Sequence, residues 1–393
     1  MKIEEFAKTF DCQVLGPEES HKILKLFDDV SLPGDKHNLS MKQEPDCFRF
    51  LKYVSDHHYV LGCPNSKGEL EGMAMLAARP CYINGRPDQV AHFFDLRRKP
   101  KSDRTITTTD WKNFGLEFIR RGEAMEELAG CRIYQGSGIA TNMPAPACGG
   151  KGLLKESGCQ RPQHGARHGD TRPPERSAGL SEKAAESFLV SNLASCRMVN
   201  LYARLPKDGP EGGPARWSDK KISVSRGTGA DRERLKTFLD KQNRLKMFGY
   251  IYNKEKGELE RRLRDWDGFS MASFFIARDA FEEIIGAFGV FDQKIDILYL
   301  TSLELDYRLM PGERMDVFDL MLTALYESGL PGRYRRVSFC DYNRQSLLDV
   351  VKNKYLYETV PVRLYQLHAP EAREVYREDQ MRYPPGHEMV LMP

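Results

Sequence analysis

Five basic side chains stand between an apolar stretch and an amphipathic one in the first third of the chain. The apolar stretch 91–96 predicts a strand, and large apolar residues at helical spacing after 107–110 predict a helix. A helix start presents unpaired backbone N–H groups and the positive end of its dipole. Basic residues just before it therefore indicate a diphosphate site, although a solvated loop has a similar composition. The five are Arg97, Arg98, Lys99, Lys101 and Arg104, with Asp103 as the one acid among them.

Two side chains on the predicted strand are candidates for proton transfer. Asp95 is a carboxylate next to the basic run, and His92 titrates near neutral pH, which suits removal of a proton. Each has a structural alternative, because Asp95 could pair with an arginine and His92 could be a hydrogen-bonded, half-buried residue. The two are three positions apart, so a regular strand directs them to opposite faces. Only one of them can serve a given site.

Length and composition indicate a soluble protein with more than one domain. A chain of 393 residues favours two or three domains, and 40% hydrophobic with 29% charged residues is ordinary for globular proteins. No apolar run approaches the roughly 18 residues that a membrane span needs. The first residues carry acids where a signal peptide is apolar, so we expect a cytoplasmic protein without membrane contact.

The charge distribution and the cysteine positions bear on nucleic-acid binding, disulfides and zinc. The net charge of +3 is dispersed and forms no basic stripe with interleaved aromatics, which argues against nucleic acid. The nine cysteines are scattered and contain no CxxC pair, which predicts reduced thiols rather than a disulfide framework or a zinc site.

The first half reads as helices followed by an antiparallel meander. Residues 17–30 and 48–54 predict helices, and 59–63, 73–77 and 81–83 predict strands. Asn84-Gly85 marks a tight hairpin turn before the next strand. Residues 132–136 predict the strand that follows the central helix.

Residues 158–180 interrupt this pattern. They contain almost no apolar side chains and many Pro, Gly, Arg and His, which predicts an exposed loop. His164 and His168 are four apart, as in helical metal sites, but Gly165 and Gly169 disfavour a helix there. We therefore predict no metal. A Gly- and Pro-rich linker covers 207–219.

Beyond the linker the same order of elements returns at an offset of roughly 200 residues, which predicts an internal duplication. The landmarks are the strand before the central helix and an Asn-x-x-small box at Asn142 and again at Asn343. The repeated elements are strands at 222–224, 272–277, 284–291, 297–305, 336–339 and 360–367, and helices at 230–245, 313–328 and 344–353.

This order of elements resembles the GNAT superfamily of acyl-CoA-dependent N-acyltransferases, in a tandem form with degenerate phosphate loops. The motifs that carry the resemblance are FFDLRRKPKSDRTIT and TNMPA. It implies an α/β fold of mixed α+β type with two GNAT-like domains, each a mostly antiparallel mixed sheet flanked by helices. The expected boundaries are 1–206 (with 158–180 as the exposed loop), the linker 207–219, 220–370 and a tail at 371–393.

The resemblance also implies the site. In GNAT proteins the acyl-CoA arm lies in a gap between the central strand and its neighbour, and the loop and helix start hold the pyrophosphate. Thr107 and Thr109 stand where that family has glycines, and the second half carries acids around Arg308 in its loop. The first half is therefore the predicted cofactor site, with the second in a structural or substrate-shaping role. The implied cofactor contacts are Phe94, Leu96, Arg97, Arg98, Arg104, Thr107, Thr109 and Asn142.

The function implied is transfer of an acyl group, most simply acetyl from acetyl-CoA, to the amine of a small molecule or peptide. Asp95 or His92 would take the amine proton. The acid for the departing thiolate has no clear candidate, and Tyr355 and Tyr357 are the nearest equivalents. One alternative is a catalytically degenerate binding or regulatory module, and another is a transferase that uses aminoacyl-tRNA or acyl carrier protein as donor.

Overall fold

The computed structural model describes residues 2–30, 47–99, 121, 125–128, 131–139, 189–202, 221–246, 248–252, 257–292, 297–342, 347–352 and 354–368. They form a mixed α/β structure in which most strand pairs are antiparallel, which confirms the predicted fold class.

The N-terminal half carries the helices α1 (Ile3–Lys8), α2 (Ser20–Asp29) and α3 (Cys47–Val54) and the short turns η1 (Pro17–Glu19) and η2 (Glu126–Leu128). Its strands are β1 (Gln13–Leu15), β2 (His57–Pro64), β3 (Leu70–Ile83), β4 (Arg86–Arg98), β5 (Cys131–Ile139) and β6 (Leu189–Tyr202).

The C-terminal half carries α6 (Arg232–Arg244), α7 (Glu258–Asp265), α8 (Pro311–Glu327) and α9 (Leu348–Lys352), with η3 (Gly229–Asp231), η4 (Met271–Ser273) and η5 (Leu330–Arg333). Its strands are β7 (Ser223–Arg226), β8 (Phe248–Tyr250), β9 (Phe274–Arg278), β10 (Ile284–Asp292), β11 (Ile297–Leu305), β12 (Arg336–Tyr342) and β13 (Tyr357–His368).

The predicted hairpin at Asn84-Gly85 is present between β3 and β4. Both residues have positive φ, 47° and 79°, as a tight two-residue turn requires. The two strands predicted before it are one continuous strand, β3, because Arg79 and Pro80 stay in register with β4 through the position where we expected a break.

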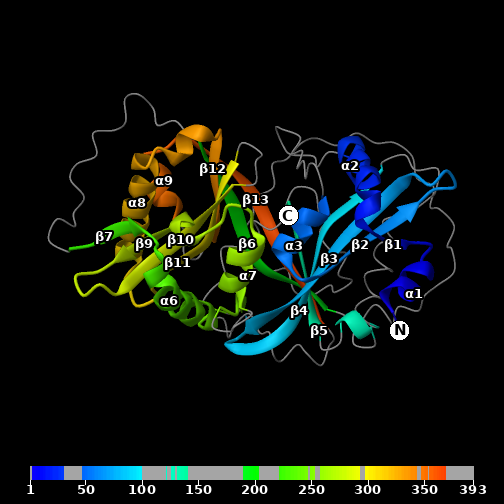
Figure 1. Cartoon of the computed structure of the whole chain (residues 1–393), viewed down its shortest axis with the longest axis horizontal. Helices are drawn as coiled ribbons and strands as arrows, with labels where there is room; N and C mark the ends of the chain where they lie inside the picture. Colours follow the sequence, from blue (N-terminus) through cyan, green and yellow to red (C-terminus); the bar gives the residue numbers. More distant parts are fainter. Residues whose placement is uncertain are drawn as a thin grey trace, which may run out of the picture.

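The two halves share one sheet by exchanging their last strands (Figure 1). The strand order is β1-β2-β3-β4-β5-β13-β6-β12-β11-β10-β9-β7, with β8 paired to β3 off this path. Thus β6 of the first half lies against β12 of the second, and β13 of the second lies against β5 of the first. The predicted linker and tail lie outside the described residues, so the domain boundaries remain predictions.

Three apolar clusters hold the layers together. One joins the halves, because it combines α2, α3 and one face of β2 to β4 with α6, α7 and β8. A second packs α8 and α9 on β9 to β12, and a third packs α1 and η2 on the opposite face of the N-terminal strands. Burial of these faces supplies most of the folding free energy, at about 25 cal/mol for each Å² of apolar surface.

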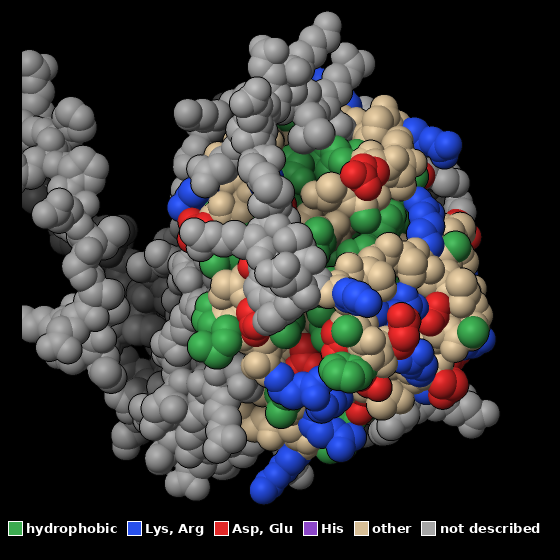
Figure 2. All heavy atoms as spheres, turned by 90° about the vertical axis from the view of Figure 1, so that its left-hand side faces the viewer, with side chains coloured by type: hydrophobic (Ala, Val, Ile, Leu, Met, Phe, Trp, Pro, Cys, Tyr) green, Lys and Arg blue, Asp and Glu red, His purple; other side chains and the backbone are tan. Residues whose placement is uncertain are grey.

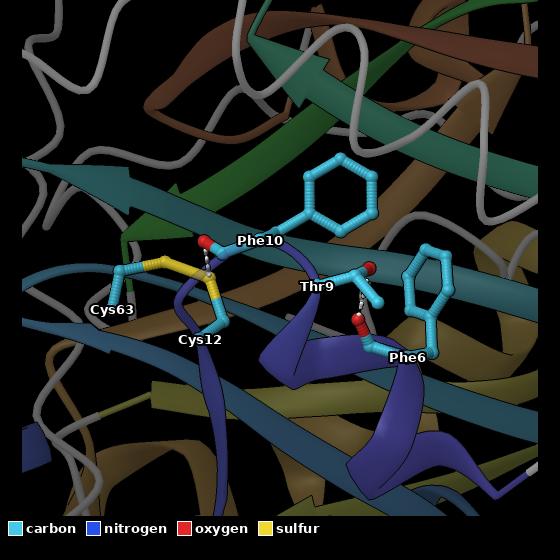
Figure 3. The surroundings of a disulfide bond; sticks show 5 residues. All are labelled: Phe6, Thr9, Phe10, Cys12 and Cys63. Atoms are coloured by element: carbon cyan, nitrogen blue, oxygen red, sulfur yellow. Dashed lines mark hydrogen bonds between the residues drawn. A yellow bond between two sulfur atoms is a disulfide. The ribbon is translucent and has the colours of Figure 1, made fainter.

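Two cysteines contradict the prediction of reduced thiols throughout. Cys12 and Cys63 form a disulfide that ties the turn after α1 to β2 (Figure 3). Neither residue belongs to a motif, and 51 positions separate them in sequence, so only the pairing of β1 with β2 brings them together. Cys47, Cys81, Cys131 and Cys340 are buried thiols outside this disulfide.

None of the helices that the structure describes is long and apolar enough to cross a membrane. On the face of the C-terminal half in Figure 2, acidic side chains lie among the basic ones, and several basic side chains gather near the lower edge.

Candidate functional site

The central parallel strands of the N-terminal half, β4 and β5, separate part-way along. Their pairing runs from Gln89 opposite Cys131 to Phe93 opposite Gly136. From Gly136 onward β5 is still paired with β13 on its other side, whereas β4 continues to Arg98. In the described part of the chain no strand pairs with β4 beyond Phe93 on the β5 side. Backbone groups at such an edge can bind an extended ligand by strand-like hydrogen bonds.

A β-bulge lies immediately beyond this separation. Phe94 pairs with Met75 of β3 and Arg97 pairs with Met73, so two β4 residues, Asp95 and Leu96, face one β3 residue. A bulge of this kind bends the strand and redirects the groups beside it. The backbone of Phe94, Asp95 and Leu96 is therefore placed at the parting of the strands, while their side chains lie outside what the structure describes.

His92 lies just before the bulge and is buried, with 2% of its surface exposed. Burial, and secondarily the positive charge of Arg79, lowers the pKa of His92 to about 3. At neutral pH the imidazole is uncharged, and a base this weak is poorly matched to an amine proton.

Arg97 is placed differently from the predicted phosphate contact. Only 2% of it is exposed, and its guanidinium lies 4.0 Å from the ring centre of Phe27. Its Nη1 donates to the Val30 carbonyl oxygen at 2.8 Å. Arg97 thus serves the end of α2, and we leave it out of the phosphate contacts proposed below.

Arg98 and Lys99 end the strand. Arg98 is half-buried opposite Gly72, and the Lys99 Nζ lies 2.7 Å from Asp29 Oδ2. The other predicted contacts, Arg104, Thr107, Thr109 and Asn142, lie outside the described residues. So do the loop 158–180 and the second Asn box, and the predictions made for them stay predictions.

The C-terminal half repeats this geometry. β11 and β12 are parallel and pair from Ile297 opposite Arg336 to Tyr299 opposite Ser338. Beyond that point, Phe288 of β10 faces two β11 residues, Ser302 and Leu303. Ser302 has φ of 51°, which is rare for a residue with a Cβ and marks local strain. The predicted duplication therefore extends to the parting and the bulge.

The turn after β11 is closed by its own carboxylates. Asp306 accepts hydrogen bonds from the backbone N–H of Arg308 at 2.9 Å and from the Arg308 guanidinium. Burial alone would raise the pKa of Asp306, but the bonds from Arg308 outweigh it and the pKa is lowered. At the start of α8, the Met310 N–H donates to Glu313 Oε2 at 2.9 Å. Two backbone N–H groups of this turn, those of Arg308 and Met310, are thus already bonded to carboxylates.

Side chains of the C-terminal half also bond to the bulge of β11. Arg262 of α7 donates to Thr301 Oγ1 at 2.7 Å and to Ser302 Oγ at 2.8 Å, and the Tyr252 hydroxyl lies 3.1 Å from Ser302 Oγ. Sequence reasoning missed this cluster. The sequence signal for this cluster was the spacing of Glu258, Arg261 and Arg262. An acid three and four positions before two arginines lies on the same face of a helix as both of them.

Two further predicted features concern metals and the thiolate acid. In the ranges that the structure describes, no group of three or more His, Cys, Asp or Glu side chains could hold a metal ion.

Tyr355 is buried and its ring lies 5.2 Å from that of Tyr326, on the α8 side of the C-terminal half. Burial raises the pKa of both phenols. This places Tyr355 in the second core, and the acid stays unassigned.

Comparison with known proteins gives a fold. No family model matches the chain, and no curated protein matches it by sequence. An N-acetyltransferase from Sphaerobacter thermophilus superposes with a TM-score of 0.54 at 11% identity over 90% of this chain and 94% of that one. A tandem GNAT protein from the clavulanic acid biosynthesis pathway gives a TM-score of 0.52 at 11% identity over 91% and 98%. The chain has the tandem GNAT fold.

N-myristoyltransferase from Saccharomyces cerevisiae, in a structure with bound myristoyl-CoA, shares this tandem GNAT fold. It gives a TM-score of 0.51 at 10% identity over 91% of this chain and 79% of that one. At these identities the likeness concerns the fold alone. Within the described residues, the pairing of β4 with β5 and that of β11 with β12 each stop before the strands end.

Proposed function

We propose that the protein transfers an acyl group, most simply acetyl from acetyl-CoA, to the amine of a small molecule or peptide. The observation that carries this proposal is the parting of β4 from β5 after Phe93, with a bulge at Asp95 and Leu96 just beyond it. An extended thioester arm would pair with the backbone of β4 beyond this point. Its support from other proteins is the tandem GNAT fold, which N-acyltransferases share.

The proposed cofactor site lies in the first half. The arm would run along β4 beside Phe94 and Leu96, with the pyrophosphate held by Arg98, Arg104, Thr107 and Thr109 and the adjoining part of the arm near Asn142. In the second half the equivalent turn is occupied by Asp306 and Glu313, whose charges repel a diphosphate. This contrast favours the first half for acyl-CoA and leaves the second to shape the acceptor side.

The proposed chemistry is direct transfer. The amine nitrogen attacks the thioester carbonyl carbon, the C–S bond breaks, and the products are the amide and the free thiol of CoA. Asp95 would take the proton that the amine loses, and backbone N–H groups of the β4 bulge would stabilise the oxyanion. His92 is the weaker candidate for the base because its pKa is about 3. The proposal includes the cytoplasmic location that the sequence predicts.

A matched pair of charge reversals tests which half binds CoA. Arg104→Glu should weaken acetyl-CoA binding, measured by calorimetry, by roughly 1.5 to 3 kcal/mol or more, because a charge-assisted bond is replaced by repulsion. Arg308→Glu is the control, since the Arg308 guanidinium is already bonded to Asp306. If Arg308→Glu abolishes binding and Arg104→Glu does not, the second half is the cofactor site.

A thiol-release screen with a panel of amines tests catalysis itself. Release of CoA that depends on the amine supports the transferase. Tight binding of acetyl-CoA without release by any amine would favour the degenerate module. Retention of aminoacyl-tRNA or acyl carrier protein in place of acetyl-CoA would instead identify a different donor.

A further inference from the structure

The two bulges are followed by a buried charged residue at the same position. Arg97 is the first paired residue after the bulge of β4, and Glu304 is the first after the bulge of β11. Their exposed fractions are 2% and 3%. Burial of a lone charge costs several kcal/mol unless it is bonded, so each side chain must have a specific use.

In the N-terminal half the use is to hold the end of α2. The Val30 carbonyl, at the carboxyl end of that helix, accepts the bond from Arg97, and the guanidinium covers Phe27 on the last turn. The neighbouring Lys99 pairs with Asp29 on the same turn. A cation is favoured at this end of a helix, because the carbonyl groups there carry the negative end of the dipole.

In the C-terminal half Glu304 holds the carboxyl end of α6 in a similar way, but here the strand supplies the anion and the helix end supplies the cation. It accepts a hydrogen bond from Asn243 Nδ2 at 3.1 Å and pairs with the buried ammonium of Lys246, just past the end of the helix. Both halves therefore fasten the carboxyl end of a helix to the residue that follows a bulge. Two different side chains reach the same arrangement, which indicates that the bulge needs an anchor.

We propose that Arg97 is a positioning residue for acyl transfer. By tying α2 to β4 directly after the bulge, it fixes the backbone N–H groups that face the thioester carbonyl, without touching the cofactor itself. This inference rests on the proposed function, because it assigns the β4 bulge to the acyl group. It replaces the phosphate contact that the basic run 97–104 predicts for Arg97.

The test compares Arg97→Met with a matched break of the second anchor, the double variant Glu304→Gln with Lys246→Met, which removes both charges together. Arg97→Met should lower kcat at least 10-fold while the Kd for acetyl-CoA changes less than 3-fold. The double variant should keep kcat within 3-fold. Arg97→Lys retains the charge at the helix end and should recover most of kcat. Arg97→Gln, which is polar but uncharged, takes the place of Arg97→Met if that variant does not fold, with the same expected loss of kcat.

Hydrogen exchange separates this inference from the proposed function. In Arg97→Met, exchange should accelerate in 26–30 and 94–99, and in the double variant it should accelerate in 239–246 and 301–305. If the parent transfers no acyl group, the proposed function fails and the positioning role fails with it, while local acceleration would still demonstrate the anchor.

Three outcomes overturn the inference. A Kd for acetyl-CoA that is weakened 10-fold or more at unchanged kcat would make Arg97 a cofactor contact. An equal loss of kcat in Arg97→Met and in the double variant would show a general effect of stability. Unchanged exchange in both segments of Arg97→Met would show that no anchor exists.

Discussion

Arg262 and Ser302 join α7 to the bulge of β11, with 2.8 Å between the Arg262 Nη1 and the Ser302 Oγ. The same guanidinium bonds to Glu258 Oε1 at 2.7 Å, and its neighbour Arg261 donates to the Lys52 carbonyl of α3 at 3.1 Å. Since α3 belongs to the first half, this buried cluster connects the strained strand of one half with a helix of the other. The Glu258 carboxylate pairs with both guanidinium groups.

We expect Glu258→Gln to lower the free energy of unfolding by about 3 to 5 kcal/mol, because it removes a buried anion that pairs with two buried cations. Denaturant unfolding measures this loss. Glu233→Gln is the control, since the Glu233 carboxylate that pairs with Lys236 is exposed and its loss should change stability by less than about 0.5 kcal/mol. Equal midpoints for both variants would contradict the role of the cluster.

Glu258 also predicts an acid-sensitive range of stability. Burial by itself raises the pKa of Glu258, but Arg261, Arg262 and Arg79 outweigh it and bring the pKa to about 2, from 4.5 in an unfolded chain. A carboxylate with a lowered pKa stabilises the fold above pH 4.5, and this contribution is lost as the pH falls from 4.5 towards 2.

His92 predicts a second, milder range. Its pKa falls from 6.5 in the unfolded chain to about 3 in the folded one. The unfolded state therefore binds the additional proton between those values, and stability is full above pH 6.5 and lost as the pH falls. Between pH 7 and 5 the loss should be about 2 kcal/mol, and His92→Gln should remove it. Thermal unfolding at the two pH values measures the difference, and an unchanged difference in His92→Gln would show that His92 is not the group responsible.

The sequence predicts those elements whose pattern is local. The helices at α2, α6 and α8 and the strands at β9, β10 and β11 follow from apolar periodicity, and the turn at Asn84-Gly85 follows from the need for positive φ. Sequence analysis did not predict the short elements α1, β1, β8 and α7, because segments of three to eight residues show too little periodicity. The many charged residues of α7 also suggest an exposed segment, whereas the Arg262 side chain is buried and donates a hydrogen bond to β11.

The remaining features depend on contacts between distant residues. The exchange of β6 and β13 pairs Cys131–Ile139 with residues beyond 360, and no local pattern encodes such a partner. The bulge at Asp95 is visible only in the register with β3. Arg97 belongs to the basic run by sequence, but in the structure it packs on Phe27 of α2 and donates to the carbonyl of Val30, just after that helix. Composition therefore indicates a candidate site, and the tertiary contacts place one of its predicted residues, Arg97, against α2.

The final prediction concerns the proton acceptor. If Asp95 takes the amine proton, directly or through a water, Asp95→Asn should keep the fold and the affinity for acetyl-CoA but lower turnover by about 100-fold or more. The loss should shrink at high pH, because the amine then deprotonates without help. His92→Gln is the matched control, and the low pKa of His92 predicts a much smaller effect on turnover. A larger loss in His92→Gln would transfer the role to His92, and full turnover in both variants would place the base outside β4.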